Sequence, residues 1–183
     1  MSILKVARMG HPVLRRRADE VPNPTAPEVK RLVADMVDTL RYAEGAGLAA
    51  PQVYVPLRVV IFHIPPHRAT GAPDDGPAEL TVLVNPVIEP LGEAKETGWE
   101  ACLSVPGLMG AVPRYTQIRY RGFGLEGQPI IRMASGFHAR VVQHECDHLD
   151  GTLYPMRMTD LSMLGFAEDM QKSFAEAKGV ERE

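Results

Sequence analysis

The amino-acid sequence predicts an α+β fold, with antiparallel or mixed β-sheets packed around a central helix that carries the pattern H-E-x-x-H. Helical periodicity occupies the early part and the last third of the chain, whereas strand-like segments cluster between them. Strands grouped between helices favour α+β over a regular βαβ alternation. The 183 residues suit one domain, which we expect to span residues 1–183.

A long N-terminal helix is expected over residues 26–44. Its apolar residues recur at helical spacing: Val29, Leu32, Val33, Met36, Val37 and Leu40. Thr25 and Glu28 have the spacing of a capping box, and Gly45 is expected to stop the helix.

The middle of the chain predicts strands. Residues 57–64 (LRVVIFHI) are β-branched and apolar, which indicates a buried strand, and residues 80–88 predict a second strand that closes at Asn85-Pro86 or shortly after. Residues 65–79 are rich in proline and glycine and are expected to form an exposed, mobile loop. Two alternating segments, 116–123 and 128–135, predict an antiparallel pair.

Two helices are expected after these strands. The first covers residues 136–150, with Ser135 as its N-cap and Gly151 at its end. The second is a C-terminal helix over residues 160–178. It carries an apolar stripe that we interpret as core packing: Met163, Phe166, Met170 and Phe174.

Composition excludes several classes of protein. The net charge is −3, and the basic run at residues 14–17 is followed at once by two acids, which favours a solvated turn over a nucleic-acid patch. No apolar run reaches the roughly 20 residues of a membrane span, and the N-terminus lacks the pattern of a secretory signal. We therefore expect a cytoplasmic protein. In that compartment a disulfide between Cys102 and Cys146 would be unusual.

The helix at residues 136–150 has the pattern of a metal-binding helix. His144 and His148 are four residues apart, so both imidazoles lie on one face and can bind one metal ion. Glu145 is rotated away from that face and can flank the ion, as suits a carboxylate that takes a proton from water. Cys146 lies on the opposite side, where we expect a core thiol.

A usable site needs a third ligand, and three candidates can be compared. A third histidine at the metzincin position is excluded, because Tyr154 stands there. Glu168 has a suitable spacing from His148 for a thermolysin-like site, but its polar neighbours favour a solvated face. Cys102 lies in a stretch bounded by glycine and proline, and its thiolate would bind Zn²⁺ or Fe²⁺ strongly. Separately, Gln52 is a neutral amide donor on a small-residue loop, suited to a developing oxyanion.

Taken together, the segments GAGLAAPQ (45–52), EACLSVP (100–106) and QHECDH (143–148) resemble the motifs of the peptide deformylase family, in the same order. The resemblance implies a metal-dependent hydrolase that removes the formyl group from N-formylmethionine on new polypeptides and releases formate. It implies Cys102, His144 and His148 as metal ligands, with one position left for water.

The same resemblance implies further roles. Glu145 would accept and return the proton, while the Gln52 amide and the Leu103 backbone N–H would bind the oxyanion. The substrate-binding candidates are Gly47, Leu48, Val141 and Trp99. The implied cofactor is one divalent ion, Fe²⁺ in the cell, with Zn²⁺, Ni²⁺ or Co²⁺ in purified samples. The implied partners are N-formylmethionyl nascent peptides; the ribosome near its exit tunnel stays open as another, and neither a membrane nor sequence-specific nucleic acid is expected.

One residue departs from the family motif, because Ala101 stands where glycine is usual, and a methyl group there would clash if the position needed a positive φ. Two alternatives therefore stay open. One is a gluzincin-like metallopeptidase that uses Glu168, and the other is a catalytically silent homologue that only binds formyl peptides. Asp147 is expected to pair with Arg114 or to face solvent.

Overall fold

The computed structural model describes residues 2–180. Its helices are α1 (Pro27–Tyr42), α2 (Gly136–Leu149) and α3 (Ala167–Val180), with short 3-10 helices at Pro12–Arg15, Ala50–Val53, Tyr154–Arg157 and Leu161–Met163. Its strands are β1 (Gly47–Ala49), β2 (Val59–Ile64), β3 (Ala78–Pro90), β4 (Lys95–Cys102), β5 (Val105–Tyr115), β6 (Gln117–Phe123), β7 (Pro129–Ser135) and β8 (Leu164–Phe166). None of these helices combines the length and apolar character needed to cross a membrane.

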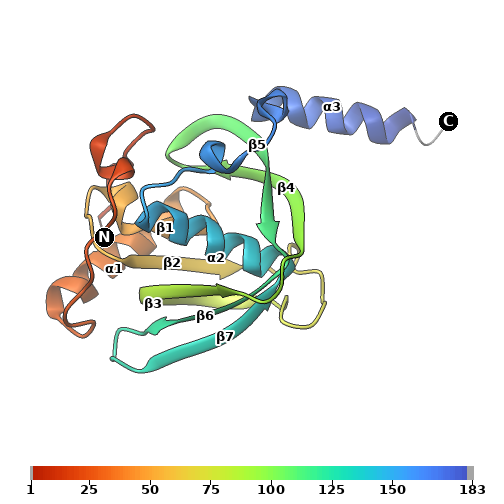
Figure 1. Cartoon of the computed structure of the whole chain (residues 1–183). Helices are drawn as coiled ribbons and strands as arrows, with labels where there is room; N and C mark the ends of the chain where they lie inside the picture. The colour runs from red at the N-terminus through yellow and green to blue at the C-terminus, as the bar shows by residue number, and fades with distance from the viewer. Residues whose placement is uncertain (1, 181–183) are drawn as a thin grey trace.

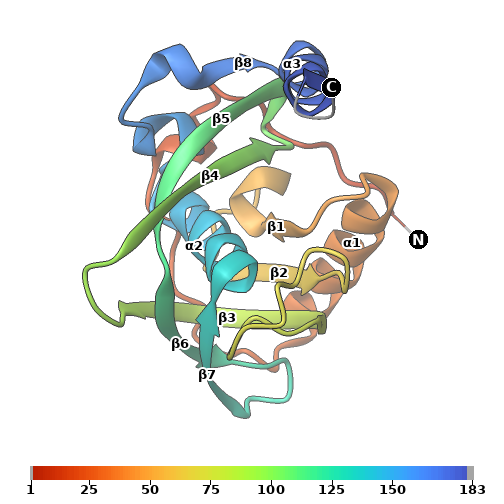
Figure 2. The ribbon, with the colours of Figure 1, turned by 90° about the vertical axis from the view of Figure 1, so that its right-hand side faces the viewer.

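The strands form two antiparallel sheets with α2 between them (Figures 1 and 2). The larger sheet has the order β1-β2-β3-β6-β7, and the smaller has the order β4-β5-β8. Helix α1 covers the β1–β2 end of the larger sheet, whereas α3 leads away from the body (Figure 1). The structure therefore confirms the α+β class and the central position of the H-E-x-x-H helix.

The core continues from the larger sheet into α2. Apolar side chains of β2, β3 and β6 pack with Val142 and Leu149 of α2, and Cys146 lies in the same cluster, which confirms it as a core thiol. A second cluster fills the space between α1 and β2 and includes Met36, Leu40 and Leu48. Residues of α2 that point away from the larger sheet are polar but still buried, so this face of the helix can contribute functional groups to a site between the sheets.

The expected capping box of α1 is wrong. The helix begins after Ala26, whose side chain offers no cap, and Pro27 supplies the fixed φ of the first turn. Thr25 bonds instead to the side chain of Asn23, through its backbone N–H at 3.0 Å and its hydroxyl at 2.8 Å. At the other end, α1 finishes at Tyr42, close to the expected stop.

The strand expected at residues 80–88 is longer than predicted, because β3 passes through Asn85-Pro86 to Pro90 with a bulge between Val84 and Val87. Asn85 has a φ of 51°, and its amide bonds the backbone N–H and carbonyl of Val21, each at 2.9 Å. The Asn85 side chain thus pairs the polar backbone groups of Val21, and these bonds stabilise the irregular turn within the strand. The antiparallel pair of β6 and β7 is confirmed.

The loop at residues 65–79 is exposed over most of its length but anchored at Asp75, which is fully buried. The Asp75 carboxylate accepts hydrogen bonds from the N–H and hydroxyl of Thr70, and from the N–H of His138 at 2.9 Å. Asp75 therefore caps the start of α2, the role expected of Ser135. The Ser135 hydroxyl instead donates to the carbonyl of Pro73 at 2.6 Å.

The C-terminal helix begins seven residues later than expected. Residues 161–166 form a 3-10 turn and β8, which pairs with β5, so the predicted stripe is not a core element. Met163 and Phe166 are exposed. Only Phe174 of the stripe packs on an aromatic ring, with its centroid 4.9 Å from that of Trp99. The helical spacing of apolar residues extends into residues 164–166, which pair as a strand instead. The prediction therefore placed the start of the helix too early.

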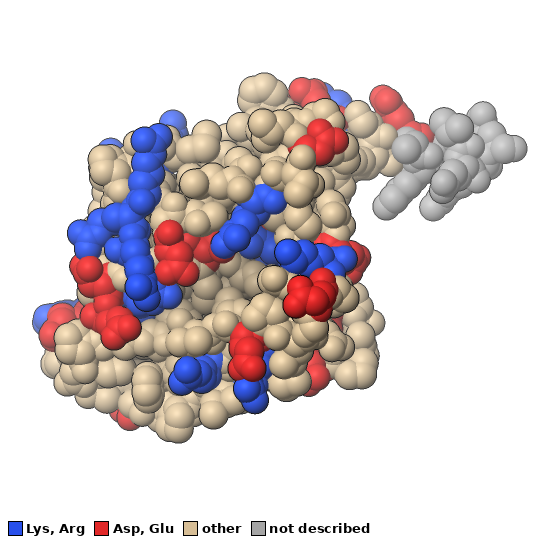
Figure 3. All heavy atoms as spheres, in the orientation of Figure 1, with Lys and Arg blue, Asp and Glu red and all other residues tan. Residues whose placement is uncertain are grey.

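The basic run at residues 14–17 forms part of a short turn rather than a patch. Leu14 is buried, Arg16 pairs with Asp19 at 2.5 Å, and Arg17 lies 3.7 Å from Asp150. Figure 3 shows basic and acidic side chains beside one another on this face of the molecule. The expected solvated turn is confirmed.

Candidate metal centre and cleft

Three buried donors converge between the two sheets. Cys102 ends β4, and His144 and His148 lie one turn apart on α2; their ligand atoms all lie within 4.8 Å of one another. The Cys102 Sγ is 3.4 Å from the His148 Nε2. Donors around one tetrahedral Zn²⁺-sized ion are about 3.3–3.6 Å apart. The chemistry and spacing of the set therefore fit a divalent metal ion.

Cys102 reaches this position because β4 turns sharply into β5. The strands pair from Lys95 to Cys102, with a register shift between Ala101 and Cys102, and only two residues connect them. Cys102 was expected only to lie in a stretch bounded by glycine and proline, and neither β4 nor β5 was predicted. Glycine and proline residues within Val105–Tyr115 interrupt the alternating pattern by which a strand is recognised.

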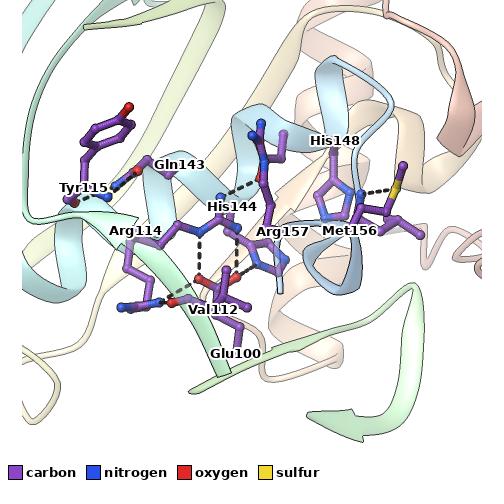
Figure 4. A network of polar contacts seen from close by, with 12 residues as sticks. Glu100, Val112, Arg114, Tyr115, Gln143, His144, His148, Met156 and Arg157 are labelled. Carbon is purple, nitrogen blue, oxygen red and sulfur yellow. Dashed lines mark hydrogen bonds and ion pairs between the residues drawn. The ribbon is translucent and has the colours of Figure 1, made fainter. Parts of the chain in front are cut away.

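A carboxylate that was not among the expected site residues orients His144. Glu100 accepts a hydrogen bond from the His144 Nδ1 at 2.8 Å, which leaves Nε2 for a metal (Figure 4). Arg114 holds the same carboxylate through two bonds of 2.8 and 2.9 Å and also pairs with Asp147. Burial alone would raise the pKa of Glu100, yet the bonds from Arg114 and His144 outweigh it and lower the pKa to about 2. Glu100 therefore stays charged.

The two histidines differ in their electrostatics. Burial opposes charge on His144, but its bonds with Cys102 and Glu100 hold its pKa well above the usual value. Burial and the neighbouring His144 lower the pKa of His148 well below its usual value. The protein's own charges and burial set both directions; a divalent ion held by the three donors would favour the neutral form of each imidazole, the form in which histidine binds a metal.

Glu145 points into the same space with an unused oxygen. Its Oε2 is buried and has no hydrogen-bond partner among the described residues. Burial raises the pKa of this carboxyl to about 7. An orphaned carboxylate oxygen beside three metal donors is suited to bind a water molecule at the open coordination position.

Gln52 is fixed by its own amide. The Oε1 accepts a bond from the N–H of Ala49 at 2.8 Å, so the NH₂ group must point the other way. That group donates to the Ser104 hydroxyl at 3.2 Å and lies 3.5 Å from the Cys102 Sγ. The structure thus places a buried amide donor beside the metal donors.

A cleft of about 640 Å³ opens onto these groups. Its lining includes several of the expected residues, namely Gly47, Gln52, Trp99, Cys102, Leu103, Val141, His144 and Glu145. Leu48 is not among them, because its side chain is fully buried in the cluster beneath α1. Ala101 also lines the cleft; it is exposed and does not have a positive φ, so its methyl group is accommodated without strain.

The competing third ligand is excluded. The Glu168 side chain on α3 is 82% exposed and pairs with Lys172 at 3.0 Å, as a solvated residue does. Asp147, by contrast, is buried and bonded to Arg114, as one of the two expectations held, and it also accepts a bond of 2.7 Å from Arg157. Asp147, Arg114 and Glu100 thus form one buried chain of charges that ends at His144.

Gly47 is needed where it stands because Glu145 packs against it. A Cβ at this position would collide with the Glu145 Oε1 and lie 2.7 Å from its Cγ. We expect Gly47→Ala to displace the carboxylate and lower kcat about 10²-fold, the usual cost of a displacement near 1 Å. Formate release measures the effect. Gly76→Ala is the control, since no atom lies within 4 Å of the place its methyl group would take; wild-type kcat in Gly47→Ala would contradict the packing argument.

The charge chain also supports the fold. Arg114→Met leaves Glu100 and Asp147 with one cation fewer at a buried position, so we expect a loss of about 3–5 kcal/mol in the free energy of unfolding. Urea denaturation measures it. Arg119→Met is the matched control, because its pair with Glu89 is roughly half exposed and worth no more than about 1 kcal/mol. Equal losses in both variants would refute the structural role of Arg114.

Comparison with known proteins points to one family. Residues 3–163 match the family model described as polypeptide deformylase. Peptide deformylase 2 of Ralstonia nicotianae is 54% identical over 166 residues, which cover 91% of this chain and 93% of the relative. Peptide deformylase 1 of Bordetella pertussis is 53% identical over 163 residues, which cover 89% of this chain and 92% of the relative.

Solved structures agree with this similarity. The crystal structure of peptide deformylase from Ehrlichia chaffeensis has a TM-score of 0.79 at 28% identity and covers 99% of this chain and 98% of that one. A Met-Ala-Ser-bound class I type b peptide deformylase from Acinetobacter baumannii has a TM-score of 0.78 at 35% identity. The match covers 86% of this chain and 100% of the other.

Proposed function

From the premise that the chain belongs to the peptide deformylase family, we propose which of its residues carry out the reaction and how. Its activity is that of a peptide deformylase, a hydrolase that acts on formylated peptides. The observation that carries the mechanism is the buried set of Cys102, His144 and His148 with the unpartnered Glu145 oxygen beside it.

The three donors would hold one divalent ion. We propose Fe²⁺ in the cell, and Zn²⁺, Ni²⁺ or Co²⁺ in purified samples, because a site with one thiolate and two imidazoles accepts all four. A bound ion supplies Lewis acidity and lowers the pKa of water at its open position. The bond from Glu100 supports the ion indirectly, since it fixes the ring of His144.

Glu145 acts as the proton carrier in this proposal. It takes a proton from the attacking water and returns it to the departing α-amine, so that the peptide leaves with a free N-terminus. A carboxyl whose pKa burial has raised to about 7 can do both near neutral pH. Its position against Gly47 keeps it from turning away.

The oxygen of the formyl group gains negative charge as the carbon becomes tetrahedral. The NH₂ of Gln52 would donate to it, since Ala49 already fixes the orientation of this amide. The backbone N–H of Leu103, at the tip of the turn after Cys102, would be the second donor. Removing one such donor typically costs about 10²–10³ in rate.

The substrate would lie extended in the cleft. We propose that its methionine side chain lies near Trp99 and Val141, both of which line the cleft, and that the backbone of Gly47 and Leu48 pairs with the peptide main chain. The Met-Ala-Ser found with the Acinetobacter baumannii relative supports a tripeptide of this kind as ligand. Leu48 can contribute only through its backbone, because its side chain is buried in the core.

The wider setting follows from the substrate. We propose that residues 1–183 form one catalytic domain and that it works in the cytoplasm, where formylated nascent chains arise. Docking near the ribosomal exit tunnel would bring the cleft to its substrate.

Formyl-Met-Ala-Ser and acetyl-Met-Ala-Ser test the proposal on the wild-type protein loaded with metal. The added methyl group of the acetyl substrate has to fit between the metal donors and the small residues of the 45–52 loop, so we expect hydrolysis to be slower by about 10²-fold or more. Free amine release measures both reactions. Comparable rates would mean that this site does not select the formyl group.

A further inference from the structure

Arg140 lies one helical turn before His144 and crosses the cleft wall from α2 to the smaller sheet. Its guanidinium donates to the carbonyls of Glu96 and Val112, each at 2.8 Å, and of Gly98 at 3.3 Å. It also donates to the Glu100 carboxylate at 3.0 Å, and its side chain is only 13% exposed. A planar group held by four acceptors has little freedom to move.

Gly98 lies directly beneath this guanidinium. A Cβ at position 98 would be 2.8 Å from both the Cζ and the Nη2 of Arg140. The φ of Gly98 is not positive, so glycine is required here because there is no room for a side chain, and not because of an unusual backbone conformation. Arg140 fills the volume that a side chain on β4 would otherwise occupy, and accordingly Arg140 lines the cleft whereas Gly98 does not.

We propose that Arg140 and Gly98 form a matched pair that limits the size of the side chain accepted for the first residue of the substrate. The inference rests on the proposed function, which places that side chain near Trp99 and Val141. Trp99 and Val141 line the same cleft as Arg140. With Phe137, they complete an apolar wall that Arg140 closes with its stem.

The Arg140 guanidinium also provides hydrogen-bond donors to the backbone carbonyls of this wall. Without the guanidinium, the carbonyls of Glu96, Gly98 and Val112 would lose a donor and face the enlarged pocket. Arg114 would still hold Glu100 through two bonds, so the orientation of His144 would be preserved. Arg140 is therefore a specificity-determining residue, and its loss should change substrate choice more than it changes metal binding.

The test compares Arg140→Ala, Arg140→Met and Gly98→Ala, and also Gly98→Ala combined with each Arg140 variant. The substrates are formyl-Met-Ala-Ser and formyl-Phe-Ala-Ser, and metal content is measured for every sample. In Arg140→Ala we expect the ratio of kcat/KM for the Phe over the Met substrate to rise about tenfold or more with metal content unchanged. Arg140→Met refills most of the volume and should return the ratio to within about threefold of wild type.

The Gly98→Ala variants give a second comparison in the same experiment. Gly98→Ala alone should raise KM for the Met substrate about tenfold, because the guanidinium is displaced into the pocket. Combined with Arg140→Ala or Arg140→Met, the same substitution should change KM less than about threefold. Should Arg140→Ala fail to fold, the Arg140→Met background still provides this comparison.

The possible outcomes distinguish a failure of the proposed function from a failure of the matched pair. A wild-type protein that releases no formate would overturn the proposed function itself. An active wild type whose Phe-to-Met ratio is the same in Arg140→Ala would overturn only the matched pair. The same holds if Gly98→Ala costs as much in the Arg140→Met background as it does when Arg140 is present.

Discussion

Replacing Glu145 with glutamine is expected to lower kcat about 10³-fold while the protein keeps its metal. The amide has nearly the same shape but cannot take a proton from water or return it to the leaving amine, and such proton transfers contribute about 10²–10⁴ in rate. Steady-state formate release from formyl-Met-Ala-Ser gives kcat, and elemental analysis gives the metal content.

Glu168→Gln is the matched control for this experiment. It removes the same charge from an exposed position on α3, so its kcat should stay within about twofold of wild type. If Glu145→Gln retained a tenth or more of the wild-type kcat with full metal content, another group would have to carry the proton.

Replacing Cys102 with serine is expected to abolish both tight metal binding and activity. The thiolate is the one anionic donor among the three ligands, and a neutral hydroxyl is a far weaker partner for Fe²⁺ or Zn²⁺. We expect metal content below about a tenth of an equivalent per chain after gel filtration. With Co²⁺ loaded, wild type should show a thiolate-to-metal absorption band, and this band should be absent from Cys102→Ser.

The second cysteine provides the control. Cys146 is buried on the far side of α2 among apolar side chains, and burial raises the pKa of its thiol, so it is inert. Cys146→Ala should therefore keep its metal and its Co²⁺ spectrum. Full metal occupancy in Cys102→Ser, or loss of the Co²⁺ band in Cys146→Ala, would exclude the proposed ligand set.

Much of the site could be predicted because its chemistry is encoded locally. His144, Glu145 and His148 form a pattern on one helix, and helical geometry alone places the imidazoles together. Cys102 could be chosen only with the help of the family motifs, because its contact with α2 spans more than forty residues and depends on how two sheets meet. Spacing along the chain carries no information about such an approach.

The role of Glu100 could have been predicted from the sequence. Glu100 lies two residues before Cys102, and on a strand this spacing places both side chains on the same face. The segment was described only as bounded by glycine and proline, and no strand was predicted there. Had β4 been predicted, a carboxylate aligned with a metal ligand would have suggested a partner for a ligating histidine.

Asp75 illustrates a limit of a different kind. Composition correctly indicated an exposed loop, but one carboxylate within it is completely buried and caps a helix some sixty residues away. The cap of α2 was sought in the preceding residue, since local caps are the rule. Long-range caps of this kind leave no trace in the spacing of residues near the helix.

The ligands come from both halves of the protein: the thiol is attached to the three-stranded sheet, and the imidazoles to a helix seated on the five-stranded sheet. A bound ion would therefore cross-link the two sheets, and chelation should loosen the architecture as well as abolish turnover. Apo-protein ought to melt at a lower temperature and be cut faster by proteases near the β4–β5 hairpin, with both properties restored on remetallation.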